Sequence, residues 1–235
     1  MLRLLAKGID RRSLDKGLGV AAELAPPAIV RDLLIAGADP EAWDFFGFTA
    51  LMRAVGRKHA RVVKVLLAHG AEVNAKSDAY VGDAPGMLRT PLMLAAMSGD
   101  LRTVLLLLRA GADPTATERD GYTALHWAAF YAAPSPVLEA LLDRGAKIDP
   151  VDVYGRTPLI LAAWQGALAA AETLVARGAQ MNLRDHESFS AWMWAVKWGH
   201  SAVAQLLAEC GAVIETDEVQ VVPGEIRRFL TAHPR

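Results

Sequence analysis

The sequence contains a single cysteine, Cys210, in 235 residues. One cysteine cannot form a disulfide within the chain, so the fold must depend on an apolar core and not on cross-links. Cys210 directly precedes Gly211, at the end of a predicted helix. We expect it to be a small buried apolar side chain and not a nucleophile.

Long hydrophobic runs are also missing. The most apolar stretch, 104–108, is far shorter than the roughly 20 residues of a membrane helix. Arg3 and Lys7 interrupt the apolar N-terminus, which therefore lacks the hydrophobic region of a signal peptide. We expect a cytoplasmic protein without a membrane partner, and leave a removed signal sequence or secretion open.

Neither sign of charge is in excess, since 26 acidic residues nearly balance 25 basic ones. Such a chain has no general field that attracts nucleic acid or an anionic membrane. Hydrophobic residues make up 53% of the chain, which is too many for a disordered protein. The composition indicates a folded protein, and we expect no nucleic-acid partner, although a local basic patch stays open.

Motifs that carry chemistry are absent from the sequence. It has no phosphate-binding loop, nucleophile elbow or pair of cysteines. Asp185, His186 and Glu187 are metal-ligand types, but adjacent residues in a turn do not converge on one ion. We therefore expect no enzyme, no bound metal and no cofactor.

What the sequence does have is an internal repeat. Gly-Ala pairs recur at intervals of 33, 41, 34, 33 and 33 residues, at Gly37, Gly70, Gly111, Gly145, Gly178 and Gly211. A second series of short motifs begins at Thr49, Thr90, Thr123, Thr157 and Ser190. A fixed period of 20 to 50 residues is typical of a repeat architecture. The two interlocked series predict a stack of similar units.

Each unit is predicted to be two short helices followed by a finger-like loop. The hydroxyl residues are good N-caps, and Pro91 and Pro158 stand at first helical positions, where a missing N–H costs nothing. The Gly of each Gly-Ala pair supplies a left-handed helix end. Because one unit cannot bury its own apolar face, stability must come from stacking on its neighbours.

These motifs resemble the ankyrin repeat family, whose signature is Thr-Pro-Leu-His at a period of about 33 residues. The resemblance extends to the loop residues Asp44, Asp152, Asp185, Gly47, Gly121 and Gly155. It implies an all-α, ankyrin-type helical repeat solenoid with short β-turn fingers. It also places His126 at the signature histidine, which bonds to the backbone of a neighbouring turn.

The chain is predicted to be a single domain over 1–235. Residues 1–39 form a degenerate N-terminal capping repeat in which Ser13 caps a helix, 40–212 form five full repeats, and 213–235 form a C-terminal cap. Residues 4–10 echo the end of a repeat, which leaves open a natural chain that begins further upstream. The long interval predicts a lengthened finger loop at 76–89, either a functional loop or a tolerated insertion.

The resemblance implies that a protein partner contacts the fingers and the exposed side of the first helices, which together form a concave face. Aromatic residues concentrate there, and interface hot spots are enriched in Trp and Tyr. Some of them, Trp127 and Trp194 in particular, could instead fill gaps between helices. The residues expected to contact the partner are Phe45, Phe46, Phe48, Arg57, Met87, Arg89, Tyr122, Phe130, Tyr131, Tyr154, Arg156, Trp164, Gln165, Phe189, Trp194, Lys197 and Trp198.

The function expected from this pattern is recognition of a folded protein on an aromatic-rich concave face. The chain would act as an inhibitor, an immunity protein or an adaptor, and would be monomeric without its partner. A secreted effector or scaffold acting on a host protein is the alternative. The Ala-rich composition, with Arg in excess of Lys, favours a bacterial source.

Overall fold

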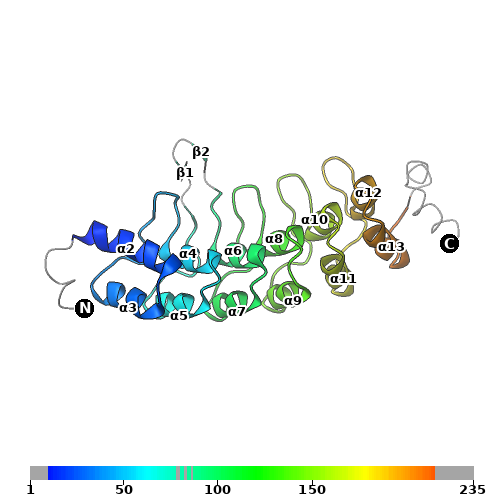
Figure 1. Ribbon diagram of the computed structural model, residues 1–235. Coiled ribbons are helices and arrows are strands. Elements are labelled where there is room, and N and C mark those ends of the chain that lie inside the picture. The colour runs from blue at the N-terminus through cyan, green and yellow to red at the C-terminus, as the bar shows by residue number, and fades with distance from the viewer. Residues whose placement is uncertain (1–9, 78–79, 82–83, 86, 215–235) are drawn as a thin grey trace. The chain divides into compact units, whose positions relative to one another are not determined.

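A computed structural model describes residues 10–77, 80–81, 84–85 and 87–214 (Figure 1). The contacts divide the chain into two units, 1–119 and 120–235, which are described separately. The single domain expected over 1–235 stays a prediction. Residues 4–9 and almost all of the expected C-terminal cap lie outside the described residues.

Unit 1 consists of helix pairs that stack in two layers. Its helices are α2 (Arg11–Leu24), α3 (Pro27–Ile35), α4 (Ala50–Gly56), α5 (Ala60–Ala68), α6 (Pro91–Ser98) and α7 (Leu101–Arg109). The first helices α2, α4 and α6 pack in one layer, and the second helices α3, α5 and α7 pack in the other. A finger-like loop follows each second helix (Figure 1).

Unit 2 repeats the same arrangement. Its helices are α8 (Ala124–Phe130), α9 (Ser135–Asp143), α10 (Pro158–Gln165), α11 (Leu168–Ala176), α12 (Ala191–Lys197) and α13 (Ser201–Glu209). Here α10 packs between α8 and α12, while α11 packs between α9 and α13. The predicted all-α helical repeat is confirmed in both units.

The predicted N-caps begin the first helices. The Thr157 hydroxyl accepts a hydrogen bond from the backbone N–H of Ile160 at 3.3 Å. Equivalent bonds are made by Thr49, Thr90, Thr123 and Ser190. A cap satisfies one of the N–H groups that the first helical turn leaves unpaired. The hydroxyl series in the sequence therefore marks where each first helix starts.

Small side chains let the helices approach one another. Ala162 and Ala163 of α10 are completely buried, as are the alanine pairs of α6 and α8. Trp192 is 1% exposed and fills the position where leucine is usual in the other repeats. Burial of apolar surface between stacked helices is the main term that stabilises each unit.

The lengthened finger contains a small hairpin. Strand β1 (Tyr80–Val81) pairs antiparallel with β2 (Ala84–Pro85). At the base of the loop, the backbone N–H of Ser77 donates to the carbonyl of Arg89 at 2.9 Å. The hairpin lies within residues 76–89.

Two predictions about helix ends are wrong. The N-cap of α2 is Asp10, whose carboxylate accepts from the backbone N–H of Ser13 at 3.0 Å, so Ser13 lies inside the helix. Cys210 is exposed, not buried. The buried side of α13 includes Val203 and Leu207, and Cys210 ends the helix on its outer side.

Candidate protein-binding surfaces

An aspartate organises the tip of each aromatic finger. In unit 1, one carboxylate oxygen of Asp44 accepts from the backbone N–H groups of Phe46 at 2.8 Å and Phe48 at 3.1 Å. In unit 2, Asp152 and Asp185 accept equivalent pairs of N–H groups. The side chain replaces backbone partners in a tight turn. The fingers therefore hold their tips in a defined conformation.

The fingertip patch of unit 1 comprises Trp43, Phe45, Phe46 and Phe48. Phe45 is 87% exposed, and Trp43 and Phe46 are more than half exposed. The rings of Phe45 and Phe46 meet edge to face with centroids 5.5 Å apart. Exposed apolar side chains that cluster in this way are typical of interaction sites.

Arg53 of α4 packs against two rings of this patch. Its guanidinium carbon lies 5.1 Å from the ring centroids of both Phe46 and Phe48. The same guanidinium forms ion pairs with Asp44 and Glu23. Cation–π contacts and ion pairs together reduce the freedom of the rings before any partner binds.

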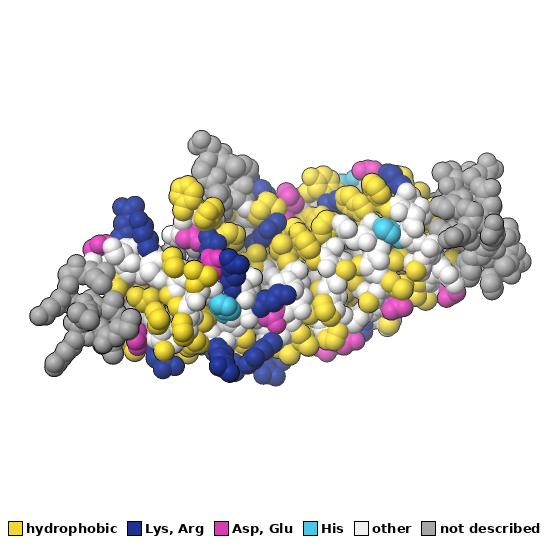
Figure 2. Space-filling view, viewed as in Figure 1, with side chains coloured by type: hydrophobic (Ala, Val, Ile, Leu, Met, Phe, Trp, Pro, Cys, Tyr) yellow, Lys and Arg dark blue, Asp and Glu magenta, His cyan; other side chains and the backbone are white. Residues whose placement is uncertain are grey.

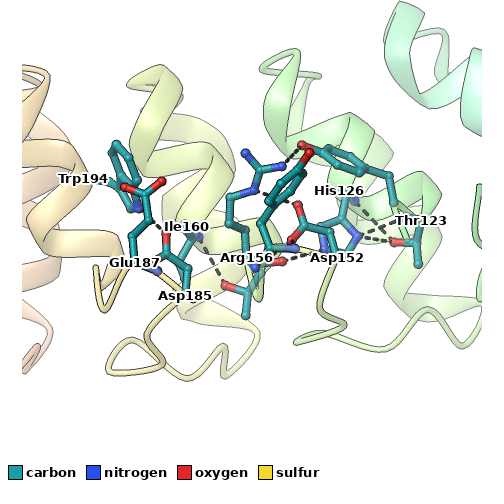
Figure 3. A network of polar contacts seen from close by, with 11 residues as sticks. Thr123, His126, Asp152, Arg156, Ile160, Asp185, Glu187 and Trp194 are labelled. Atoms are coloured by element: carbon teal, nitrogen blue, oxygen red, sulfur yellow. Dashed lines mark hydrogen bonds and ion pairs between the residues drawn. The ribbon is translucent and has the colours of Figure 1, made fainter. Parts of the chain in front are cut away.

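Arg156 has a similar role in unit 2. Its side chain is 12% exposed, pairs with the fully buried Asp152 at 2.7 Å and donates to the Tyr122 hydroxyl at 2.7 Å (Figure 3). Its guanidinium carbon lies 4.4 Å from the ring centroid of Tyr154 and 5.1 Å from that of Trp164. Its expected contact with a partner stays a prediction, and within the chain its guanidinium packs against the surrounding rings.

A continuous series of touching rings, the aromatic ladder, crosses α8, α10 and α12. It consists of Tyr122, Trp127, Phe130, Tyr131, Trp164, Phe189 and Trp194. Phe130 meets Trp164 edge-on, with centroids 6.4 Å apart, and Trp164 stacks on Trp194 at 5.1 Å. Figure 2 shows apolar side chains over α8 and α10.

The rings of the ladder differ in exposure: some are buried and form its floor, and others are exposed and form its rim. Tyr122, Trp127 and Trp194 are each less than 10% exposed, and the indole N–H of Trp194 donates to Asp185 at 2.7 Å. Trp127 and Trp194 therefore fill gaps between helices, which is the alternative that the sequence left open for them. Tyr131 is 51% exposed and forms part of the rim.

Trp198 and Lys197 extend the exposed surface at the end of α12. Trp198 is 54% exposed. The ammonium nitrogen of Lys197 lies 4.3 Å from the ring centroids of both Phe189 and Trp194. A cation on the face of these rings gives this end of the ladder a positive charge.

The remaining predicted residues are scattered. Arg57 is exposed and forms an ion pair with Glu23, and its hydrogen bond lowers the pKa of Glu23. Met87 and Arg89 are half-buried at the base of the lengthened finger. Gln165 is exposed at the end of α10. None of these four lies in the fingertip patch or the ladder.

Two exposed apolar side chains near Tyr154 were not predicted from the sequence. Val151 is 58% exposed and Val153 is 52% exposed, one on each side of Asp152. A valine in a loop is not in itself a signal of exposure. Their exposure could have been predicted from their position on either side of Asp152, because the side chain of this aspartate turns inward and its neighbours turn outward.

His126 is a structural residue. Its Nδ1 accepts from the backbone N–H of Thr123 at 3.0 Å, and its Nε2 donates to the carbonyl of Arg156 at 3.1 Å (Figure 3). Burial lowers the pKa of His126 to about 4, which keeps the ring neutral at pH 7. The backbone contact implied by the family resemblance is confirmed.

Within the described ranges, no group of three or more His, Cys, Asp or Glu side chains could hold a metal ion. In the same part of the chain, no helix is long and apolar enough to cross a membrane.

Comparison with known proteins gives a family match over most of the chain. A family model described as ankyrin repeats, in three copies, matches residues 18–118, 92–185 and 155–218. The chain is 30% identical over 234 residues to the E3 ubiquitin-protein ligase KEG of Arabidopsis thaliana, with 80% of the chain covered. It is 30% identical over 209 residues to the ankyrin repeat protein nuc-2 of Neurospora crassa, with 86% covered.

A third relative is the palmitoyltransferase AKR1 of Lachancea kluyveri, 34% identical over 155 residues and 64% of the chain. The aligned parts make up 14%, 19% and 20% of the lengths of the three relatives. The chain therefore corresponds to a small portion of each. The ligase and transferase activities that these names describe belong to those longer proteins.

Proposed function

The chain belongs to the ankyrin repeat family, and from that premise we propose that it binds a folded protein through the fingertip patch and the aromatic ladder. Ankyrin repeats are protein-interaction modules. The observation that supports this choice of surface is the aromatic ladder, whose rim includes the half-exposed Tyr131. Trp198, also half-exposed, caps the C-terminal end of α12, the helix that carries Trp194. Rigid aromatic side chains gain contact area on binding at little entropic cost.

The ankyrin fold is typically non-catalytic, and we propose that this chain has no enzymatic activity of its own. It would act by occupying its partner as an inhibitor, an immunity protein or an adaptor, and would be monomeric without that partner. The cytoplasmic location and the bacterial source stay predictions.

Affinity purification with the whole chain as bait tests the proposal. The chain should recover one protein in stoichiometric amount. Trp164→Ala combined with Trp198→Ala should lose it, because both indoles would contact the partner directly. Phe45→Ala combined with Phe46→Ala should weaken recovery as well.

The matched control truncates exposed apolar side chains outside both surfaces. Val20 and Leu24 of α2 are 61% and 72% exposed, so Val20→Ala with Leu24→Ala should recover the partner as well as the unmodified chain does. Circular dichroism should show the same helical content for every variant. Equal recovery by the variant that lacks the indoles of Trp164 and Trp198 and by the control would overturn the assignment.

A further inference from the structure

Away from the fingers, unit 1 has a hollow between the N-terminal ends of α3, α5 and α7. Its volume is about 500 Å³, and its polar lining is Lys58, His59, Arg61, Asp100 and Arg102. Sites for small molecules commonly measure about 300–1,000 Å³. The hollow is large enough for such a ligand, and it contains no residue of the fingertip patch.

The charges of this lining are not balanced. Lys58, Arg61 and Arg102 are exposed, and among the described residues none of them forms an ion pair. The one carboxylate is Asp100, which accepts from the Thr103 hydroxyl at 2.5 Å. Three cations around one carboxylate leave two positive charges uncompensated. In Figure 2, Lys and Arg side chains gather over the region of α3, α5 and α7.

The backbone at Lys58 is a second unusual feature of the hollow. Lys58 has φ 58°, in the left-handed region, where the turns after α6, α10 and α12 have Gly99, Gly166 and Gly199. The turn after α8 has Ala132 there, but it is one residue longer. A side chain in this conformation destabilises the fold relative to glycine. The residue in this strained conformation, Lys58, is one of the three cations that line the hollow.

We propose that this hollow binds the phosphate group of a phosphorylated ligand. A phosphate monoester carries a charge of about −1.5 to −2 at pH 7, which matches the uncompensated charge of the lining. Guanidinium groups donate paired hydrogen bonds to phosphate oxygens, and lysine adds a point charge. The N-terminal ends of α5 and α7 contribute further positive potential. A carboxylate offers one charge and two oxygens, and leaves the lining partly unsatisfied.

The test is a titration of the whole ¹⁵N-labelled chain with inorganic phosphate at constant ionic strength, followed by amide chemical shifts. The shifts at 58–62 and at Arg102 should saturate. Arg61→Gln with Arg102→Gln should weaken binding at least tenfold, because it removes both guanidinium contacts.

The control changes two cations of the same unit outside the hollow. Arg31 and Lys64 are exposed on α3 and α5, so Arg31→Gln with Lys64→Gln alters the net charge by the same amount. This variant should bind phosphate within about twofold of the unmodified chain. Shifts that do not saturate, or equal losses in the two double variants, would overturn the proposal.

Lys58→Gly separates binding from folding. Glycine relieves the left-handed backbone, so the midpoint of thermal unfolding should rise by roughly 3 °C. Phosphate affinity should nevertheless fall at least threefold, because one cation is lost. A stabilised variant with unchanged phosphate affinity would contradict a role for Lys58 in the site.

The ligand could be a phosphorylated side chain or a phosphorylated metabolite. A phosphoserine peptide and adenosine monophosphate distinguish these sources, with the serine peptide and adenosine as controls. Whichever phosphorylated probe binds at least tenfold more tightly than inorganic phosphate identifies the source. Binding of the unphosphorylated probes as tightly as their phosphorylated forms would overturn the assignment of the hollow to phosphate.

Discussion

At the scale of single residues, buried polar groups connect neighbouring repeats of unit 2. His126 joins the start of α8 to the finger ahead of α10, through Thr123 on one side and Arg156 on the other. Asp152 and Arg156 form a buried ion pair in that finger. These contacts fix the fingers on which the exposed rings depend, so we expect them to matter for stability more than for direct binding.

His126 should make the protein less stable as the pH falls. Its pKa is about 4 in the folded chain, against an ordinary value of 6.5, so the unfolded chain binds the proton first. The stability that neutral His126 contributes is present above pH 6.5 and is lost as the pH falls from 6.5 to 4. The free energy of unfolding should therefore drop by about 2 kcal/mol between pH 7 and pH 5. Urea unfolding at both values should show this loss, and His126→Gln should show a smaller one. An equal loss in the variant would contradict the assignment.

Loss of the buried ion pair should be more costly than loss of an exposed one. Arg156→Ala leaves the buried carboxylate of Asp152 without its cation and should lower the free energy of unfolding by about 3 kcal/mol. Arg177→Ala breaks the exposed pair with Asp143, at 2.7 Å, and should lower it by less than about 1 kcal/mol. Urea unfolding of both variants makes the comparison, and similar losses would show that Arg156 is not a buried support.

Residue-level features were predictable where local chemistry decides them. The N-cap hydroxyls follow from the sequence because a cap acts on its own helix. The sequence did not predict the packing of Arg156 against the rings or the exposure of Cys210. Both depend on which side of a helix or finger meets its neighbour. Ser13 was predicted as a cap because its side chain suits one, but Asp10 stands three residues earlier and takes that place.

At the scale of helices and turns, some glycines are required by close approach as well as by backbone conformation. Gly166 ends α10 with φ 70°, and a Cβ there would lie 2.5 Å from Nδ1 of His200. The His200 ring is held by the hydrogen bond that its Nε2 donates to the carbonyl of Trp164 at 3.0 Å. The ring cannot move away without breaking that bond.

Gly166→Ala should therefore destabilise more than Gly178→Ala. Gly178 has φ 90° but no atom within 4 Å of its would-be Cβ, so only backbone strain of about 1 kcal/mol is expected. At Gly166 the clash with His200 should add about 2 kcal/mol. Thermal and urea unfolding of the two variants measure the difference. Equal losses would mean that the close approach to His200 costs nothing.

The elements themselves were largely predictable, because the repeat gives each helix several independent signals. The hydroxyl cap and the proline after it place the starts of α6 and α10, at Pro91 and Pro158. The hairpin of β1 and β2 was not predicted. An insertion between repeats reveals its length through the spacing, whereas its internal pairing has no repeated counterpart in the sequence.

At the scale of the whole molecule, each unit combines a family scaffold with its own exposed aromatic surface. Stacked helices provide rigid platforms, and the fingers and helix ends carry rings such as Phe45 in unit 1 and Trp198 in unit 2. The resemblance predicted where these rings would be. It could not predict which would be floor and which rim, because that depends on the packing of α8, α10 and α12.

The most direct test of the central claim is the equilibrium affinity of the purified partner for the double tryptophan variant, measured by calorimetry. Truncation of hot-spot tryptophans typically costs 2 kcal/mol or more each, so Trp164→Ala with Trp198→Ala should weaken binding by at least about 100-fold. Val20→Ala with Leu24→Ala should leave the affinity within about twofold. An affinity of the double tryptophan variant within about threefold of the unmodified chain, with its fold intact, would show that the partner binds elsewhere.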